Sequence, residues 1–142
     1  MKMKLKVGRV QMWSATIDDQ AGGLAAVLDP VAKAGADFEF VFARRAPEQP
    51  GKGLLFVLPL KRAKAVRAAQ EAGLAKAEGI HTVKIEGTNQ PGATAAIAGA
   101  LAAAGISFRG FSATAVGRKF SGYLALDSAE DAAKAASVLK KL

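Results

Sequence analysis

The sequence predicts an α+β protein made of two tandem copies of one βαββα unit, and three observations support this prediction. The chain of 142 residues resembles itself when it is shifted by 70 positions. Each copy has runs in which apolar and polar residues alternate, as in half-buried strands. Each copy also has apolar residues at helical spacing, followed by a glycine. Besides several alanines, the coinciding residues are Gln20 with Gln90, Gly22 with Gly92, Gly35 with Gly105 and Phe38 with Phe108. A repeat of this kind indicates one supersecondary unit that occurs twice.

The first two elements of each copy are a strand and a helix. Strands are expected at residues 10–17 and 80–87, where β-branched and aromatic residues such as Trp13 and Val83 are frequent. The helices that follow have apolar stripes made of Leu24, Val27, Leu28 and Val31 in the first copy and of Ile97 and Leu101 in the second. Gly35 and Gly105 are expected to end these helices, because glycine adopts the left-handed conformation of a helix terminus without strain.

Two further strands and a second helix complete each copy. Strands are expected from Phe38 to Phe42 and from Ile106, with Gly110 at a bulge before Phe111. Their hairpin partners are expected at residues 54–58 and 123–126, and the second helices at about 61–72 and 128–140. Ser128 precedes two acidic residues, which is typical of a helix amino terminus.

These elements predict two tandem ferredoxin-like βαββα(β) sandwiches, with antiparallel sheets and helices on one face. The first domain is expected at 1–78 and the second at 79–142. This fold needs a fourth strand, which residues 74–78 can supply in the first copy, whereas the second copy ends without one. Met3, Leu5 and Val7 alternate with lysines, so we expect an amino-terminal strand at 2–7 to complete the sheet of the second copy.

The segment from Leu54 to Leu58 is apolar at every position, although a strand with one solvated face should alternate. The sheet face away from the helices is therefore expected to be covered by a second chain. This pattern predicts a homodimer.

Composition excludes several classes of protein. No cysteine is present, so disulfides and thiol nucleophiles are excluded, and no apolar run is long enough to span a membrane. Nothing in the first residues is typical of a signal peptide, so we expect a cytoplasmic protein. The net charge of +8 suits a polyanionic partner, but the lysines are scattered along the chain, so a solvated basic surface is favoured over nucleic-acid binding.

Catalytic chemistry is not indicated. His81 is the single histidine, Asp18 and Asp19 are adjacent rather than separated as an acid–base pair, and no glycine-rich phosphate loop occurs. We therefore expect no enzyme activity, no metal and no cofactor.

The turn between the first strand and the first helix of the second copy is the strongest candidate site. Here Pro91 is expected at the first helical position and Asn89 or Gln90 at the cap. Gly92 allows close approach of a ligand, and the free N–H groups at the helix start suit a carboxylate. Ordinary helix capping explains the same residues equally well.

The element order and the turn Asn89, Gln90, Pro91, Gly92 resemble the ACT domain, over nearly the whole chain from about Val10. The equivalent turn of the first copy is Asp19, Gln20, Ala21, Gly22, with alanine in place of proline. The resemblance implies a non-catalytic, allosteric regulatory protein that binds a small molecule, an amino acid, where two such domains meet. It implies ligand contacts from Asn89, Gln90, Pro91 and Gly92 and from Asp19, Gln20 and Gly22. It also implies a partner enzyme of amino-acid metabolism.

Two alternatives belong to other classes. An RRM-like RNA-binding module shares this sandwich, and Lys119 to Leu126 matches its third-strand signature in part. The strand around Val83 to Ile85 lacks the stacking aromatic residue that such a module needs. The third possibility is a protein-interaction module whose turns bind no ligand.

Overall fold

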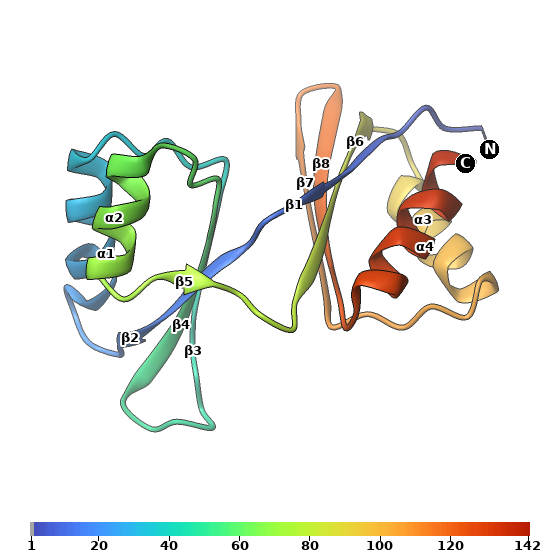
Figure 1. Ribbon diagram of the computed structural model, residues 1–142. Coiled ribbons are helices and arrows are strands. Elements are labelled where there is room, and N and C mark those ends of the chain that lie inside the picture. The colour runs from blue at the N-terminus through green and yellow to red at the C-terminus, as the bar shows by residue number, and fades with distance from the viewer. Residues whose placement is uncertain (1) are drawn as a thin grey trace. The chain divides into compact units, whose positions relative to one another are not determined.

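The computed structural model describes residues 2–142, which form two compact units (Figure 1). The inner unit comprises Gln11–Ala77. The split unit comprises the described residues up to Val10 together with Glu78–Leu142. The sequence places the boundary near residue 78 and assigns the amino-terminal strand to the second repeat. In the structure the described residues up to Val10 and the second repeat fall in the same unit.

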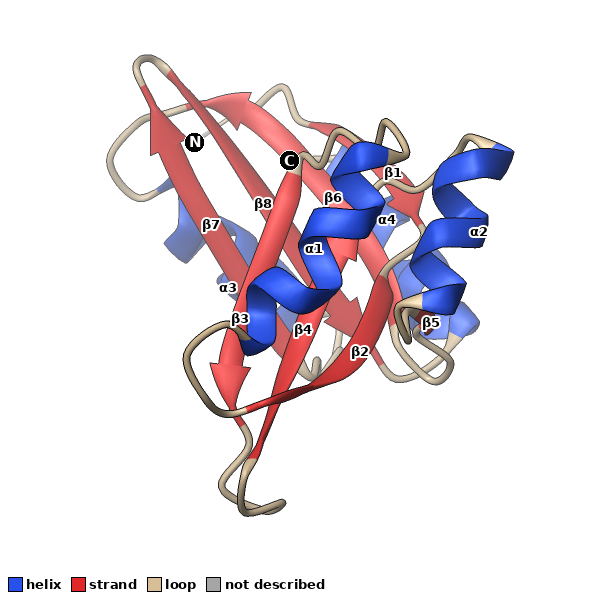
Figure 2. Ribbon diagram, turned by 90° about the vertical axis from the view of Figure 1, so that its left-hand side faces the viewer, coloured by secondary structure: helices blue, strands red, loops and turns tan. Residues whose placement is uncertain are grey.

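The inner unit is one βαββα repeat with a short additional strand. Its elements are β2 (Trp13–Asp18), α1 (Gly23–Lys33), β3 (Phe40–Arg45), β4 (Lys52–Leu58), α2 (Ala63–Glu71) and β5 (Ala75–Lys76). The strands form an antiparallel sheet in the order β3-β4-β2-β5. Helices α1 and α2 lie on the same face of this sheet (Figure 2).

The split unit repeats this arrangement and takes its fourth strand from the amino terminus. Its elements are β1 (Lys6–Val10), β6 (His81–Thr88), α3 (Ala93–Ala103), β7 (Gly110–Val116), β8 (Lys119–Leu126) and α4 (Ala129–Lys140). The sheet order is β1-β6-β8-β7, and β1 pairs antiparallel with β6 from Lys6 opposite Glu86 to Val10 opposite Thr82. The predicted α+β class, with two ferredoxin-like repeats, is confirmed.

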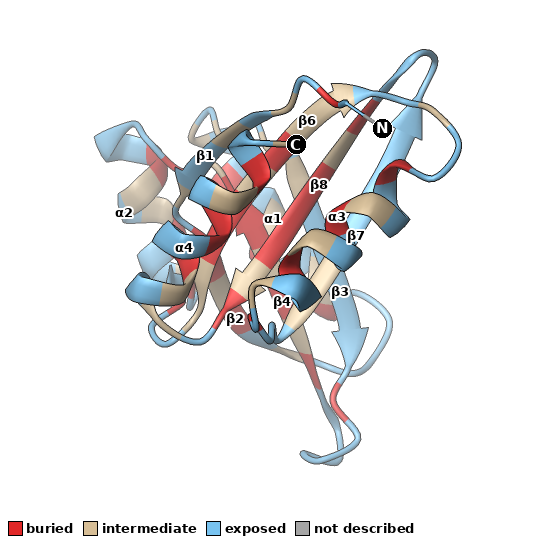
Figure 3. Cartoon of the chain, turned by 90° about the vertical axis from the view of Figure 1, so that its right-hand side faces the viewer, coloured by how far each residue is buried: buried red, intermediate tan, exposed pale blue. Residues whose placement is uncertain are grey.

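Each unit has its own hydrophobic core between its sheet and its helices. In the inner unit, Trp13, Leu55 and Val57 from the sheet pack with Val27 and Val31 of α1. The core of the split unit includes Val83, Ile85 and Leu124 from the sheet, Ile97 and Leu101 from α3, and Met3 from the amino-terminal segment. Buried residues accordingly follow β8 and the inward sides of α3 and α4 in Figure 3. Burial of each such side chain contributes about 1.5–3 kcal/mol to folding.

The repeat extends to individual hydrogen bonds. Gly22 and Gly92 both precede a helix with positive φ, at 88° and 83°. The helices end alike, because Ala36 N–H donates to the Val31 carbonyl at 3.2 Å and Ile106 N–H donates to the Leu101 carbonyl at 2.9 Å. The helix ends expected at Gly35 and Gly105 agree with their positive φ and with α1 and α3 ending nearby.

Three local expectations were wrong. The third strands of the repeats begin at Phe40 and Gly110, so Phe38 and Phe108 lie in the loops before them, although Phe38 still packs on the inner core. Gly110 is not at a bulge, because it pairs with Ala125 and the next residues continue in the same register. The amino-terminal strand lies at Lys6–Val10 rather than at 2–7.

Candidate functional site

The turn between β6 and α3 is built by its backbone. Asn89 N–H donates to the Arg118 carbonyl at 2.7 Å, which ties the turn to the β7–β8 hairpin. Ala93 N–H donates to the Gln90 carbonyl at 3.2 Å, and Ala96 N–H donates to the Gly92 carbonyl at 2.9 Å. Of the first four amides of α3, those of Thr94 and Ala95 therefore remain as donors at the helix start.

The expected capping roles in this turn were wrong. Gly92 is the residue before the helix, and no side chain caps α3. Pro91 thus lies two residues before the first helical residue, Ala93, rather than at the first helical position. Among the residues that the structure describes, the side chains of Asn89 and Gln90 make no hydrogen bond. Ordinary capping therefore does not explain these two polar side chains.

A hollow of about 190 Å³, which we call the turn hollow, lies beside this turn. Its walls come from the turn, the first residues of α3, the middle of edge strand β7 and one buried ring of β8. The lining residues are Asn89, Gln90, Gly92, Ala93, Thr94, Ala113, Thr114, Ala115 and Phe120. Pockets for drug-sized ligands begin near 300 Å³, so this hollow suits a smaller molecule.

The electrostatics of the turn hollow favour a negative group at the helix start. No acidic residue occurs in the first turn of α3, so the partial positive charge of the helix terminus is not neutralised there. Asn89 and Gln90 can donate or accept hydrogen bonds, and Thr94 adds a hydroxyl group. The hollow therefore has donors for a carboxylate and acceptors for an ammonium group.

The turn between β2 and α1 has the same backbone but a different chemistry. Asp19 N–H donates to the Gly51 carbonyl at 3.0 Å and Gly23 N–H donates to the Gln20 carbonyl at 3.0 Å, as in the other repeat. Here, however, the Asp19 carboxylate accepts a hydrogen bond from Arg45 Nε at 2.6 Å. The position equivalent to Arg45 in the second repeat is Ala115, so this contact occurs in one repeat alone.

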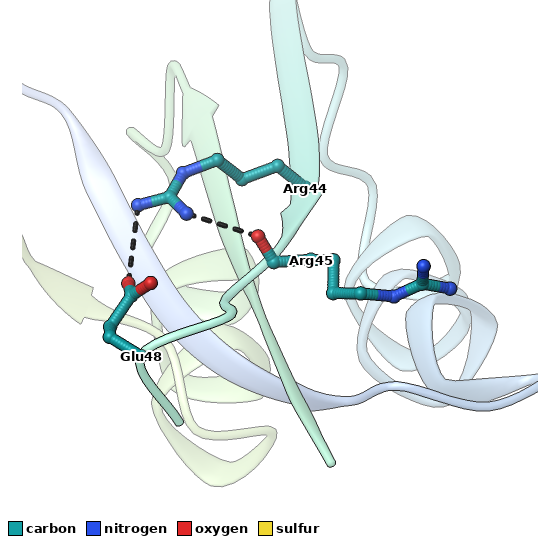
Figure 4. A network of polar contacts seen from close by, with 3 residues as sticks. All are labelled: Arg44, Arg45 and Glu48. Carbon is teal, nitrogen blue, oxygen red and sulfur yellow. Dashed lines mark hydrogen bonds and ion pairs between the residues drawn. The ribbon is translucent and has the colours of Figure 1, made fainter. Parts of the chain in front are cut away.

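Strand β3 and the hairpin after it hold further charges, and the side chains of Arg44 and Arg45 point to opposite sides of the strand (Figure 4). Arg44 donates to the Arg45 carbonyl at 3.0 Å and forms an ion pair with Glu48 at 3.5 Å. Lys52 pairs with Asp18 at 2.7 Å. Both carboxylates at the end of β2 are thus satisfied within the inner unit.

The helix start is also closer to the strand in the inner unit. A Cβ atom on Gly23 would lie 2.0 Å from the Asp18 carbonyl oxygen, so no side chain fits there. The equivalent residue of the split unit is Ala93, which has a Cβ atom and lines the turn hollow. The space between strand end and helix start is therefore open in the split unit and closed at this position in the inner unit.

The structure thus places the expected site residues in two separate turns. Asn89, Gln90 and Gly92 line the turn hollow, whereas Pro91 belongs to the turn without lining it. Asp19, Gln20 and Gly22 form the equivalent turn of the inner unit. Sequence reasoning missed the wall formed by Ala113–Ala115 and Phe120. The pairing of β8 with β6 places Phe120 opposite Gly87, next to the turn, so the hairpin pattern contained part of this signal.

Other functional centres have little support. Among residues 2–142, no group of three or more His, Cys, Asp and Glu side chains is arranged to hold a metal ion. His81 Nδ1 lies 3.4 Å from an Arg9 nitrogen on the neighbouring strand. Within the same residues, no helix has the length and apolar character that crossing a bilayer requires.

Comparison with known proteins shows the fold. No family model matches the sequence, and no curated protein matches it. Protein BT0572 from Bacteroides thetaiotaomicron superposes with a TM-score of 0.75 at 20% identity, covering 96% of this chain and 99% of that one. The ligand-free regulatory subunit of aspartate kinase from Thermus thermophilus superposes with a TM-score of 0.65 at 18% identity. The match covers 97% of this chain and 95% of that one. E. coli aspartokinase III in complex with aspartate and ADP superposes with a TM-score of 0.57 at 14% identity, and the match covers 97% of this chain and 32% of that one.

Proposed function

We propose that this protein is a non-catalytic regulatory protein of the ACT type that binds an amino acid in the turn hollow of the split unit. The observation that carries the proposal is a hollow at the start of α3 lined by polar side chains that are not used for capping. The similarity in fold to the regulatory subunit of aspartate kinase supports a regulatory role.

In this proposal the two charged groups of the amino acid bind to different parts of the turn. The carboxylate accepts hydrogen bonds from the free amides at the start of α3, where the helix dipole also favours a negative charge. The ammonium group donates to the side-chain oxygen of Asn89 or Gln90. The small residues Ala113 and Ala115 leave room for a short side chain beside β7.

The turn of the inner unit has a structural role in this proposal. Arg45 already supplies a cation to Asp19 at 2.6 Å, so the ammonium group of a ligand would have to displace it. The close approach of Gly23 to Asp18 also removes space at the helix start. Asp19, Gln20 and Gly22 therefore shape this turn, and the ligand contacts come from Asn89, Gln90 and Gly92, with Pro91 shaping the turn that presents them.

We further propose that the protein acts as a homodimer and regulates a separate enzyme of amino-acid metabolism. Strand β7 is an edge of its sheet, has no charged residue and ends in Val116, which is 76% exposed. Unprotected edges of this kind pair readily with another strand. Because Ala113–Ala115 of β7 line the turn hollow, a second copy paired there would add the missing wall of the site.

Thermal unfolding in the presence of each of the twenty amino acids tests the ligand. A ligand at about one hundred times its Kd stabilises the folded protein by roughly 2.7 kcal/mol, so its effect on Tm is measurable. Absence of a shift with all twenty would overturn the proposal. A salt-sensitive affinity for single-stranded RNA instead would favour the RRM-like alternative.

Matched variants test the location. Asn89→Ala should lower the affinity for the amino acid by about tenfold or more, because it removes a hydrogen bond to a charged group of the ligand. Asp19→Ala changes the equivalent position of the inner unit and should leave the affinity unchanged. The opposite result would place the ligand at the other turn.

A further inference from the structure

A second hollow, which we call the terminal hollow, lies in the split unit next to the amino-terminal segment. It has a volume of about 360 Å³ and is lined by Lys2, Met3, Lys4, Leu5, Thr88 and Gln90. This volume is within the usual range for small-molecule sites, which begins near 300 Å³. Gln90 lines this hollow and the turn hollow alike.

Apolar contacts hold the amino-terminal segment in place. Met3 is 4% exposed and belongs to the core of the split unit, and Leu5 packs against the same core. Leu5 also lies over Gly87, where an added Cβ atom would be 2.8 Å from its Cδ2 atom. Lys2 and Lys4 alternate with these apolar residues and are exposed.

The lining of the terminal hollow is cationic. No acidic residue lines it, and among the described residues neither Lys2 nor Lys4 has an ion-pair partner. In an extended segment, side chains two residues apart are separated by roughly 7 Å. Lysine side chains are long and flexible, so two that start this close together can both reach one small anion.

Other donors lie beside these lysines. Thr88 supplies a hydroxyl group and Gln90 a carboxamide. Lys119 pairs directly with Thr88 across β6 and β8, so its side chain lies on the same face of the sheet as that of Thr88. The split unit as a whole has eleven lysines and arginines against five aspartates and glutamates. The field around the hollow is therefore positive.

We propose that the terminal hollow binds a small, multiply charged anion, with a phosphate group or with two or more carboxylates. Lysine binds phosphate as a point charge, and charge-assisted hydrogen bonds are about twice as strong as neutral ones. Lys2 and Lys4 neutralise the anion, while Thr88 and Gln90 donate to its remaining oxygens. The site adjoins the turn hollow through Gln90, and its other lining residues are different.

Isothermal titration calorimetry at constant ionic strength tests this site on the full chain. The probes are inorganic phosphate and citrate, with acetate as the singly charged comparison. We expect phosphate or citrate to bind at one site per chain and acetate not to bind. Phosphate alone or citrate alone would identify which group is recognised. Failure of both at millimolar concentration would overturn the proposal.

Two double variants with the same charge change separate a site from a general field effect. The double variant Lys2→Gln, Lys4→Gln should lower the affinity for the anion by about tenfold or more. Lys134→Gln with Lys140→Gln changes two exposed lysines of α4, outside the hollow, and should change the affinity less than about twofold. Equal weakening by both pairs would refute a specific site. The small-anion site would also be refuted if single-stranded RNA bound more tightly than citrate and lost more affinity than citrate in the Lys2, Lys4 variant.

Discussion

Replacement of Gly23 by alanine tests the close approach that distinguishes the turn of the inner unit. Gly23 has an ordinary backbone conformation, so the expected cost is purely steric. The new Cβ atom would lie 2.0 Å from the Asp18 carbonyl oxygen, whereas ordinary contact begins at 3.4 Å. Helix α1 and the end of β2 would have to separate by about 1.4 Å, which disturbs the packing of Val27 and Val31 on the sheet. Overpacking of this size costs about 1–3 kcal/mol, and the contact is with rigid backbone, so we expect about 3 kcal/mol.

The chain has its own reporter for this measurement. The single tryptophan, Trp13, is 4% exposed in the core of the inner unit, so its fluorescence follows the unfolding of that unit in urea. Gly99→Ala is the control in α3 of the split unit, where no atom lies within 4 Å of an added Cβ atom. Alanine there should stabilise the split unit by about 0.5–1 kcal/mol and leave the tryptophan transition of the inner unit unchanged. A Gly23→Ala protein with an unchanged tryptophan transition would refute the steric argument.

Three further substitutions have expected outcomes that urea or thermal unfolding can check. Gly92→Ala places a side chain at φ 83° and should cost about 1–2 kcal/mol, and a neutral result would contradict the left-handed conformation. Ser128→Ala removes the oxygen that accepts from Asp131 N–H at 3.0 Å, and a loss of about 1 kcal/mol is expected, whereas Ser112→Ala on the exposed β7 should be neutral. Leu124→Ala leaves a cavity at a fully buried position of β8 and should lower the free energy of unfolding by about 2–5 kcal/mol. A smaller loss would indicate that the core collapses into the cavity.

Much of the fold could be predicted from local patterns. The stripe from Leu24 to Val31 marks the side of α1 that packs on the core, because side chains return every turn on helices. The alternation of Phe40 and Phe42 predicted a strand, although Phe42 is 46% exposed in it. The offset of 70 positions between Gly22 and Gly92 revealed the repeat, although the two copies share few other residues besides alanines. The starts of the third strands were misplaced because Phe38 alternates with polar neighbours, yet it packs on the core from a loop. Alternation does not distinguish a strand from an extended loop that also contacts the core.

The candidate site could be predicted in part. The sequence predicts a site at Asn89 to Gly92 because these residues are adjacent in the chain, and Asn89, Gln90 and Gly92 line the turn hollow. The ion pair between Arg45 and Asp19 depends on how the β3–β4 hairpin lies beside the end of β2, and 26 positions separate its two residues. The adjacent glycines Gly22 and Gly23 were the available signal that this turn is tighter than its counterpart. The lysines of the terminal hollow were interpreted as solvated because the partner surface, β6 with its turn, is far away in sequence.

The course of the chain through the split unit has a consequence for synthesis on the ribosome. Strand β1 leaves the ribosome before the inner unit, but its partner β6 begins at His81, after the whole inner unit has been made. The inner unit is in effect an inserted domain, with its two ends joined by a hydrogen bond from Ala77 N–H to the Met12 carbonyl at 2.9 Å. It can fold while the tethered β1 waits as an unpaired strand, so the nascent chain exposes an aggregation-prone edge during that interval. Lys6 of this strand and Lys2 and Lys4 just before it are residues of the kind that oppose pairing of an unpaired strand with other chains.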